Sequence, residues 1–137
     1  MAERAPVPAP DGAFDADAVW MLFEGRTDRM AKVWRISRST LPLCVTSLES
    51  AVEAGDWTAA ARHAHSLAGS AANFGAHALV ATARRIEEGA EAGGVAATEI
   101  HEARARCDAL CTAMTPWLDR VSGGSNAPIG PGDPLLR

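Results

Sequence analysis

Two histidines, His63 and His65, stand two residues apart in the run RHAHSLAGSAANFGA, which covers residues 62–76. Alanine is the best helix former, so this run predicts a helix that carries two imidazoles. An imidazole can act as a nucleophile, an acid–base group or a metal ligand near neutral pH. Two histidines on one metal would need i, i+4 spacing, whereas positions 63 and 65 lie about 200° apart around a helix. The pair therefore predicts two separate roles.

The two faces of this predicted helix separate those roles. One face gathers the residues expected to point into the core: Ala60, Ala64, Leu67, Ala71 and Phe74. The opposite face lacks the Lys, Glu and Gln of an ordinary surface helix and surrounds His65 with small residues: Thr58, Ala61, Ala68, Gly69, Ala72 and Ala76. We therefore expect a partner protein to approach His65 closely, with Gly69 leaving space for its backbone. His63 falls at the border of the core face and is expected to be structural.

The remaining candidates for chemistry are weak. His77 and His101 have no acidic or cysteine neighbours at metal-ligand spacing, and we expect both to be structural. Cys107 and Cys111 are four residues apart, but small buried apolar residues are a better interpretation of this pair than metal ligands. The sequence contains no glycine-rich nucleotide-binding motif, no nucleophilic serine motif and no convincing pair of carboxylates. We therefore expect no metal and no cofactor in this chain.

Composition describes one small soluble domain. The chain has 137 residues, of which 47% are hydrophobic and 22% charged. A net charge of −4 argues against binding to nucleic acid, which needs a basic face. Three cysteines without framework spacing favour a reducing compartment. No apolar run resembles a signal peptide or a membrane span, so a cytoplasmic location without membrane contact is expected.

Helical periodicity predicts an all-α fold. We expect a short helix after Asp15 or Asp17, followed by four longer helical segments that cover about 27–55, 56–74, 76–91 and 95–121. Pro42 predicts either a kink or a fresh helix start in the first long segment. Short connections favour antiparallel neighbours. The expected fold is an antiparallel four-helix bundle with a short extra N-terminal helix.

The two ends differ in composition from the segment between them. Residues 1–13 are rich in proline and alanine, and residues 122–137 are punctuated by Gly, Pro and Ser. Neither end can bury enough apolar surface to offset the entropy of ordering, so both are expected to be disordered tails. The bundle is expected to occupy residues 14–121.

The run AHSLAGSAANFGA, residues 64–76, resembles the signature of histidine-containing phosphotransfer (HPt) domains, roughly His-x-Leu-Lys-Gly-Ser-Ala followed by Phe/Leu-Gly-Ala. The likeness covers about residues 28–121. It implies a four-helix bundle in which an exposed histidine, here His65, carries a phosphoryl group, with Gly69 and Gly75 matching the two family glycines. It also implies a response regulator receiver domain and a hybrid histidine kinase as partners. Because the receiver brings the Mg²⁺, the bundle would need no cofactor, and it is expected to be a monomer.

One position departs from the family pattern. The family lysine three residues after the histidine is Ala68 here, so a cation that would lie beside the phosphoryl group is missing. Arg62 either replaces this lysine or is a solvated surface residue. Two readings therefore stay open, a phosphocarrier without kinase or ATPase activity and a degenerate HPt-like scaffold that docks a receiver or kinase. A kinase fragment is disfavoured because a nucleotide-binding region is missing, and a metal- or haem-binding bundle because the inward stripes lack ligands.

Overall fold

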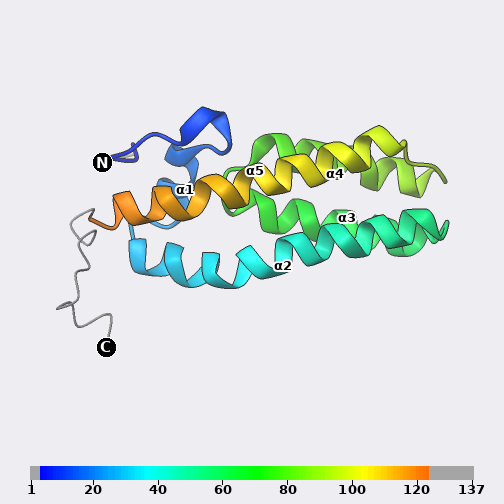
Figure 1. The fold of residues 1–137 in the computed structure, drawn as a ribbon, viewed down its shortest axis with the longest axis horizontal. Helices are drawn as coiled ribbons and strands as arrows, with labels where there is room; N and C mark the ends of the chain where they lie inside the picture. The colour runs from blue at the N-terminus through cyan, green and yellow to red at the C-terminus, as the bar shows by residue number, and fades with distance from the viewer. Residues whose placement is uncertain (1–3, 124–137) are drawn as a thin grey trace.

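The computed structural model describes residues 4–123, and this part of the chain is helical without any strand (Figure 1). The elements in chain order are a 3-10 turn η1 (Pro10–Gly12) and the helices α1 (Ala16–Leu22), α2 (Thr27–Glu53), α3 (Trp57–Ala72), α4 (His77–Glu91) and α5 (Ala97–Val121). None of these helices is both long and apolar enough to cross a membrane. The predicted all-α fold with a short first helix is confirmed.

Helices α2 to α5 form an antiparallel bundle. Helix α2 packs against α3 and α5, and α4 also packs against α3 and α5, so each of the four helices has two neighbours in the bundle. Figure 1 shows the four helices lying lengthwise beside one another. The contact between α3 and α4 is the most extensive of these. Small residues make this close approach possible, because Ala64, Ala71 and Ala83 are fully buried.

Local signals in the sequence set the helix ends. The carboxylate of Asp15 caps α1 by accepting the Ala18 N–H at 3.0 Å, and that of Asp56 caps α3 by accepting the Ala59 N–H at 3.1 Å. The hydrogen bond from Ala18, together with His77, lowers the pKa of Asp15 below its ordinary value. Helix α2 runs through Pro42 from Thr27 to Glu53, so the predicted alternative of a fresh helix start at this proline is wrong.

The helices of the bundle differ in length. Helices α2 and α5 have 27 and 25 residues, whereas α3 and α4 have 16 and 15. At 1.5 Å per residue, the long pair extends roughly 15 Å past the turn between α3 and α4. Figure 1 shows the N-terminal segment at this end of the bundle, where α2 begins and α5 ends. We call residues 4–25 the N-terminal cap.

The cap covers apolar surface that α3 and α4 leave open. The buried ring of Phe14 meets Trp117 of α5 edge to face, with ring centroids 5.2 Å apart. Phe23 stacks on Phe74 at 6.1 Å, and Trp34 of α2 meets Phe74 at 5.0 Å. One end of the hydrophobic core is therefore built from the cap, α2, α5 and the residues that follow α3.

Residues 4–13 correct one expectation. Their composition predicts a disordered tail, but the structure places them on the bundle, where the Val7 carbonyl accepts the Trp117 Nε1–H at 2.7 Å. The Ala5 N–H also donates to the Asp17 carboxylate at 2.8 Å. The composition of this segment could not reveal that the Trp117 indole of α5 donates a hydrogen bond to it. Residues 1–3 and 124–137, the rest of the two expected tails, lie outside the described residues.

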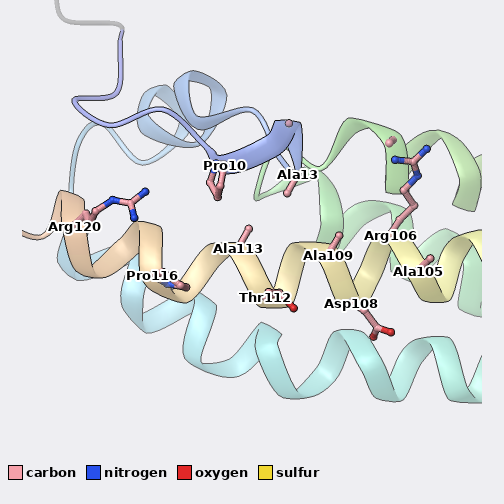
Figure 2. A pocket seen from close by; sticks show the side chains of 12 residues that line it. Pro10, Ala13, Ala105, Arg106, Asp108, Ala109, Thr112, Ala113, Pro116 and Arg120 are labelled. Carbon is pink, nitrogen blue, oxygen red and sulfur yellow. The ribbon is translucent and has the colours of Figure 1, made fainter.

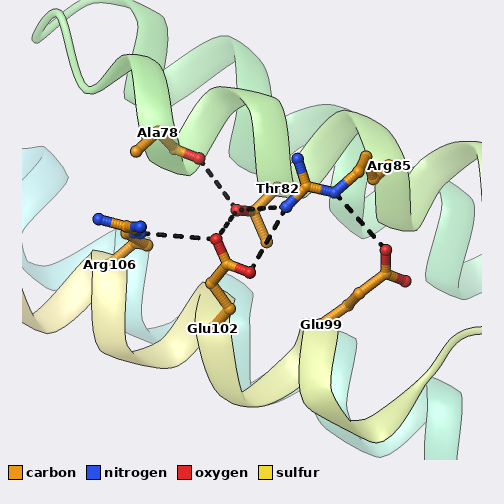
Figure 3. A network of polar contacts seen from close by, with 6 residues as sticks. All are labelled: Ala78, Thr82, Arg85, Glu99, Glu102 and Arg106. Carbon is orange, nitrogen blue, oxygen red and sulfur yellow. Dashed lines mark hydrogen bonds and ion pairs between the residues drawn. The ribbon is translucent and has the colours of Figure 1, made fainter.

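A buried polar network fixes α4 against α5 (Figure 3). The Thr82 hydroxyl is fully buried and lies 3.0 Å from both the Ala78 carbonyl and a Glu102 carboxylate oxygen. Arg85 donates to Thr82 at 3.3 Å and forms an ion pair with Glu99 at 3.6 Å. Because every buried polar atom here has a partner, the network holds α4 in one position beside α5.

Candidate functional site

His65 lies on the outer face of α3, and its side chain is 72% exposed. Arg62, Gly69 and Ala72 on the same helix are also exposed, and Ala61 is half-buried. No heavy atom of a neighbouring element lies within 4 Å of the position that a Cβ would take at Gly69. The surface beside the imidazole is therefore unobstructed at Gly69, as predicted for a face that another protein approaches.

Two residues that were expected on this face, Ala68 and Ala76, are buried instead. Ala68 is 1% exposed and Ala76 is 2% exposed, and Gly75 is buried as well. Helix α4 lies along one flank of α3 and covers Ala68, while Ala76 and Gly75 form the tight turn that leads into α4. The expectation that Ala68 and Ala76 lie on the open face was therefore wrong, and Gly75, the second of the two matched family glycines, lies inside the turn.

The imidazole of His65 is held by a carboxylate from the next helix. His65 Nδ1 lies 3.1 Å from Glu87 Oε2 on α4. The Glu87 side chain is only 21% exposed, so the carboxylate is anchored at the α3–α4 boundary while the imidazole extends into solvent. An ionised carboxylate can only accept a hydrogen bond, so Nδ1 carries the proton. The lone pair of the neutral ring then resides on Nε2, the nitrogen that a nucleophilic reaction needs.

The pattern of α3 alone does not reveal Glu87, because this residue lies on α4. Two signals could have identified it. His65 and Glu87 are each eleven residues from Ala76, at the turn of an antiparallel hairpin, so they lie at the same level of the bundle. Ile86 is fully buried, and the residue after an inward-facing position lies on a flank of its helix.

The other histidines lie in different settings. His63 is half-buried, as expected at the border of the core, and its carbonyl oxygen accepts the Cys44 Sγ–H at 3.2 Å. His101 is exposed at the start of α5. His77 has a carboxylate partner too, because its Nε2 lies 3.0 Å from Asp15 Oδ2, and its side chain is 71% exposed. In His77, however, the carboxylate occupies Nε2 and joins α4 to the N-terminal cap.

Metal-binding side chains do not gather around His65. Within residues 4–123, no three His, Cys, Asp or Glu side chains are placed to share a metal ion. Cys107 is fully buried on the core side of α5, and Cys111 is half-buried. A hydrogen bond with Cys111 and burial raise the pKa of the Cys107 thiol, so it stays protonated and unreactive.

A broad groove elsewhere on the surface does not involve α3. It has a volume of about 630 Å³ and runs between the N-terminal cap and α5 (Figure 2). Its floor consists of small residues such as Ala109 and Ala113, and Arg106 and Arg120 are among its lining residues. This groove contains no nucleophile of the kind that His65 provides.

The comparisons with known proteins agree with the motif. A family model for the Hpt domain matches residues 32–116, which is more than half of the chain. The matched segment contains both His65 and Glu87, and it leaves out the N-terminal cap and the first residues of α2. No curated protein and no solved structure gave a significant match.

Proposed function

Because the chain belongs to the Hpt domain family, we propose that it carries a phosphoryl group on His65 and relays it between the receiver of a hybrid histidine kinase and a response regulator. The observation that supports this role best is the exposed imidazole with its Nδ1 held by Glu87 on a face of small residues. The partners of this proposal are receiver domains, and the protein would act as a cytoplasmic monomer.

The proposed step is a transfer from the aspartyl phosphate of a receiver. The Nε2 lone pair of His65 attacks phosphorus, a P–N bond forms, and the P–O bond to the receiver aspartate breaks, which returns a carboxylate to the receiver. The ring keeps its Nδ1 proton and gains a positive charge, which the Glu87 carboxylate stabilises at 3.1 Å. Transfer to the next receiver is the reverse reaction.

Charge on the phosphoryl group must be balanced largely from outside the bundle. Ala68 provides no cation, and a lysine at that buried position would have to emerge between α3 and α4. Arg62 is exposed on α3, three residues before His65, and is proposed to contribute part of the missing charge. The receiver is proposed to supply Mg²⁺, so that this chain needs no cofactor of its own.

We expect the Glu87→Ala variant to accept phosphate about tenfold more slowly than the wild type. Removing the carboxylate frees the ring to adopt the other tautomer and other orientations, and a hydrogen bond to a charged group contributes about 1.5–3 kcal/mol. Rapid-quench measurement of labelling from a phosphorylated receiver gives the rate. Glu88→Ala, which removes an exposed carboxylate at the next position, should leave the rate unchanged. Equal rates for the two variants would exclude Glu87 from positioning His65.

The relay itself is tested by incubating the protein with a receiver that carries radiolabelled phosphate. Phosphate that is labile in acid and stable in base should appear on this chain, since that behaviour distinguishes phosphohistidine from phosphoserine. The second candidate, a scaffold that docks without carrying phosphate, is favoured only by Ala68. Receiver binding without any transfer of label, from receivers and ATP-fed hybrid kinases alike, would establish the scaffold and reject the carrier.

A further inference from the structure

The first half of α2 is strongly basic. Residues 26–38 contain five of the 13 lysines and arginines of the chain, spaced three residues apart: Arg26, Arg29, Lys32, Arg35 and Arg38. The one acidic residue in this segment, Asp28, pairs with Arg26 at 3.4 Å. The segment therefore has a net charge of +4 in a chain whose net charge is −4.

These charges do not stabilise the helix that carries them. Arg29, Lys32, Arg35 and Arg38 are exposed, and in the described residues 4–123 none of them has a carboxylate oxygen within 4.0 Å. Like charges three and four residues apart repel each other and destabilise a helix. An isolated surface helix normally mixes both signs, so this arrangement indicates a surface that meets negative charge on another molecule.

Two of these basic residues line a recess that also contains apolar surface. Arg29 and Lys32 share a hollow of about 560 Å³ with Leu22, Phe23, Glu24, Val33 and Asn73. Leu22 is 56% exposed, and the adjacent Met21 is 55% exposed. Large apolar side chains this exposed are found at four described positions, and two of them are therefore at or beside this recess. The recess offers a hydrophobic contact flanked by two cations and the one carboxylate of Glu24, so its lining has a net charge of +1.

The recess is continuous with the face that carries His65. His65, Gly69 and Asn73 follow each other at four-residue intervals along α3, and all three are exposed. Asn73, which lines the recess, lies about 12 Å along the helix axis from His65. A receiver-sized protein seated over His65 would extend over the recess, yet the recess is too far away to touch the phosphoryl group.

From this geometry we infer that the recess, lined by the apolar residues Leu22, Phe23 and Val33, the cations Arg29 and Lys32, and also by Glu24 and Asn73, is the specificity site for the receiver partner. It selects receivers that present an apolar side chain flanked by carboxylates at this distance from their active site. The inference rests on the proposed function, which supplies the partner. Complementary charges at such a site raise the association rate and penalise partners of the wrong sign.

The test measures how charge-reversal variants at three positions of α2 bind, and accept phosphate from, a panel of isolated receiver domains from the source organism. We expect Arg29→Glu and Lys32→Glu each to weaken binding of the preferred receiver about tenfold and to slow phosphate transfer from it equally. The salt dependence of the association rate should decrease in both variants. Arg35→Glu, which makes the same charge change on the same helix but outside the recess, is the matched control and should have a much smaller effect.

Two further measurements separate the possible outcomes. Labelling of His65 by phosphoramidate, a small donor that needs no docking, should be the same in all variants if the recess acts in binding alone. Receiver affinity is measured without phosphate, so it tests the docking site even if no label reaches His65. Absence of label on His65 would overturn only the relay. The inference is overturned if Lys32→Glu and Arg35→Glu behave alike. It is also overturned if the variants bind receivers normally but lose binding to phosphatidylglycerol vesicles or duplex DNA.

Discussion

The His65→Gln variant should acquire no acid-labile phosphate from a phosphorylated receiver, while its far-UV circular dichroism spectrum stays that of the wild type. Glutamine has no ring nitrogen that can form the P–N bond, so the loss should be complete. The side chain is 72% exposed, and surface substitutions of this kind change stability by about 0.5 kcal/mol or less. Scintillation counting of the separated chain after the transfer reaction measures the effect.

His77→Gln is the most informative control, because His77 is equally exposed and also pairs with a carboxylate, that of Asp15. This variant should be labelled like the wild type. His63→Gln should also keep its label, although its half-buried position predicts some loss of stability. Label that survives in His65→Gln, or that disappears in His77→Gln while the protein remains folded, would contradict the assignment of His65.

Gly75→Ala should lower the free energy of unfolding by about 2–4 kcal/mol. Gly75 has a φ of +61°, where an L-residue is disfavoured by about 1–2 kcal/mol. A Cβ at this position would also lie 2.6 Å from the backbone oxygen of Asp15, whose N–H donates to the Gly75 carbonyl at 2.8 Å. Relieving this clash requires the N-terminal cap to move from the α3–α4 turn. Urea denaturation followed by circular dichroism gives the free energy.

Two other glycines separate the cost of the positive φ from the cost of the clash with Asp15. Gly55 has a φ of +70° but no heavy atom within 4 Å of the added Cβ, so Gly55→Ala should cost only about 1 kcal/mol. Gly69 lies inside α3 with open space around it, so Gly69→Ala should stabilise the protein by up to about 1 kcal/mol. If Gly75→Ala cost no more than Gly55→Ala, the contact between the cap and the turn would not contribute to stability.

The elements of the bundle could be predicted because each is specified by its own residues. Asp56 and the glycines at 55 and 75 mark the ends of α3, and the apolar stripe of Ala60, Ala64 and Leu67 identifies its inward face. These signals act over one or two turns of one helix. The exposure of His65 follows from the same stripe, since it lies opposite.

The features that could not be predicted depend on contacts between elements that are distant in the sequence. A single-helix wheel cannot show that α4 covers Ala68, nor that Glu87 meets His65 across 22 residues. Residues 4–13 have the composition of a tail and are ordered by a tryptophan 110 residues away from Val7. In each case the missing information was the partner that a residue acquires on folding.

The position of the recess, at the end of the bundle where α2 begins, has an evolutionary consequence. In the proposed relay the chemistry depends on α3 and α4, whereas the recess takes Leu22, Phe23 and Arg29 from a stretch that precedes the segment matched by the family model. If the recess selects the receiver as proposed, two copies of this protein can, after a gene duplication, change which receiver each serves through substitutions in residues 22–32. The histidine helix need not change in either copy, so pathways can become insulated from each other without passing through an inactive intermediate.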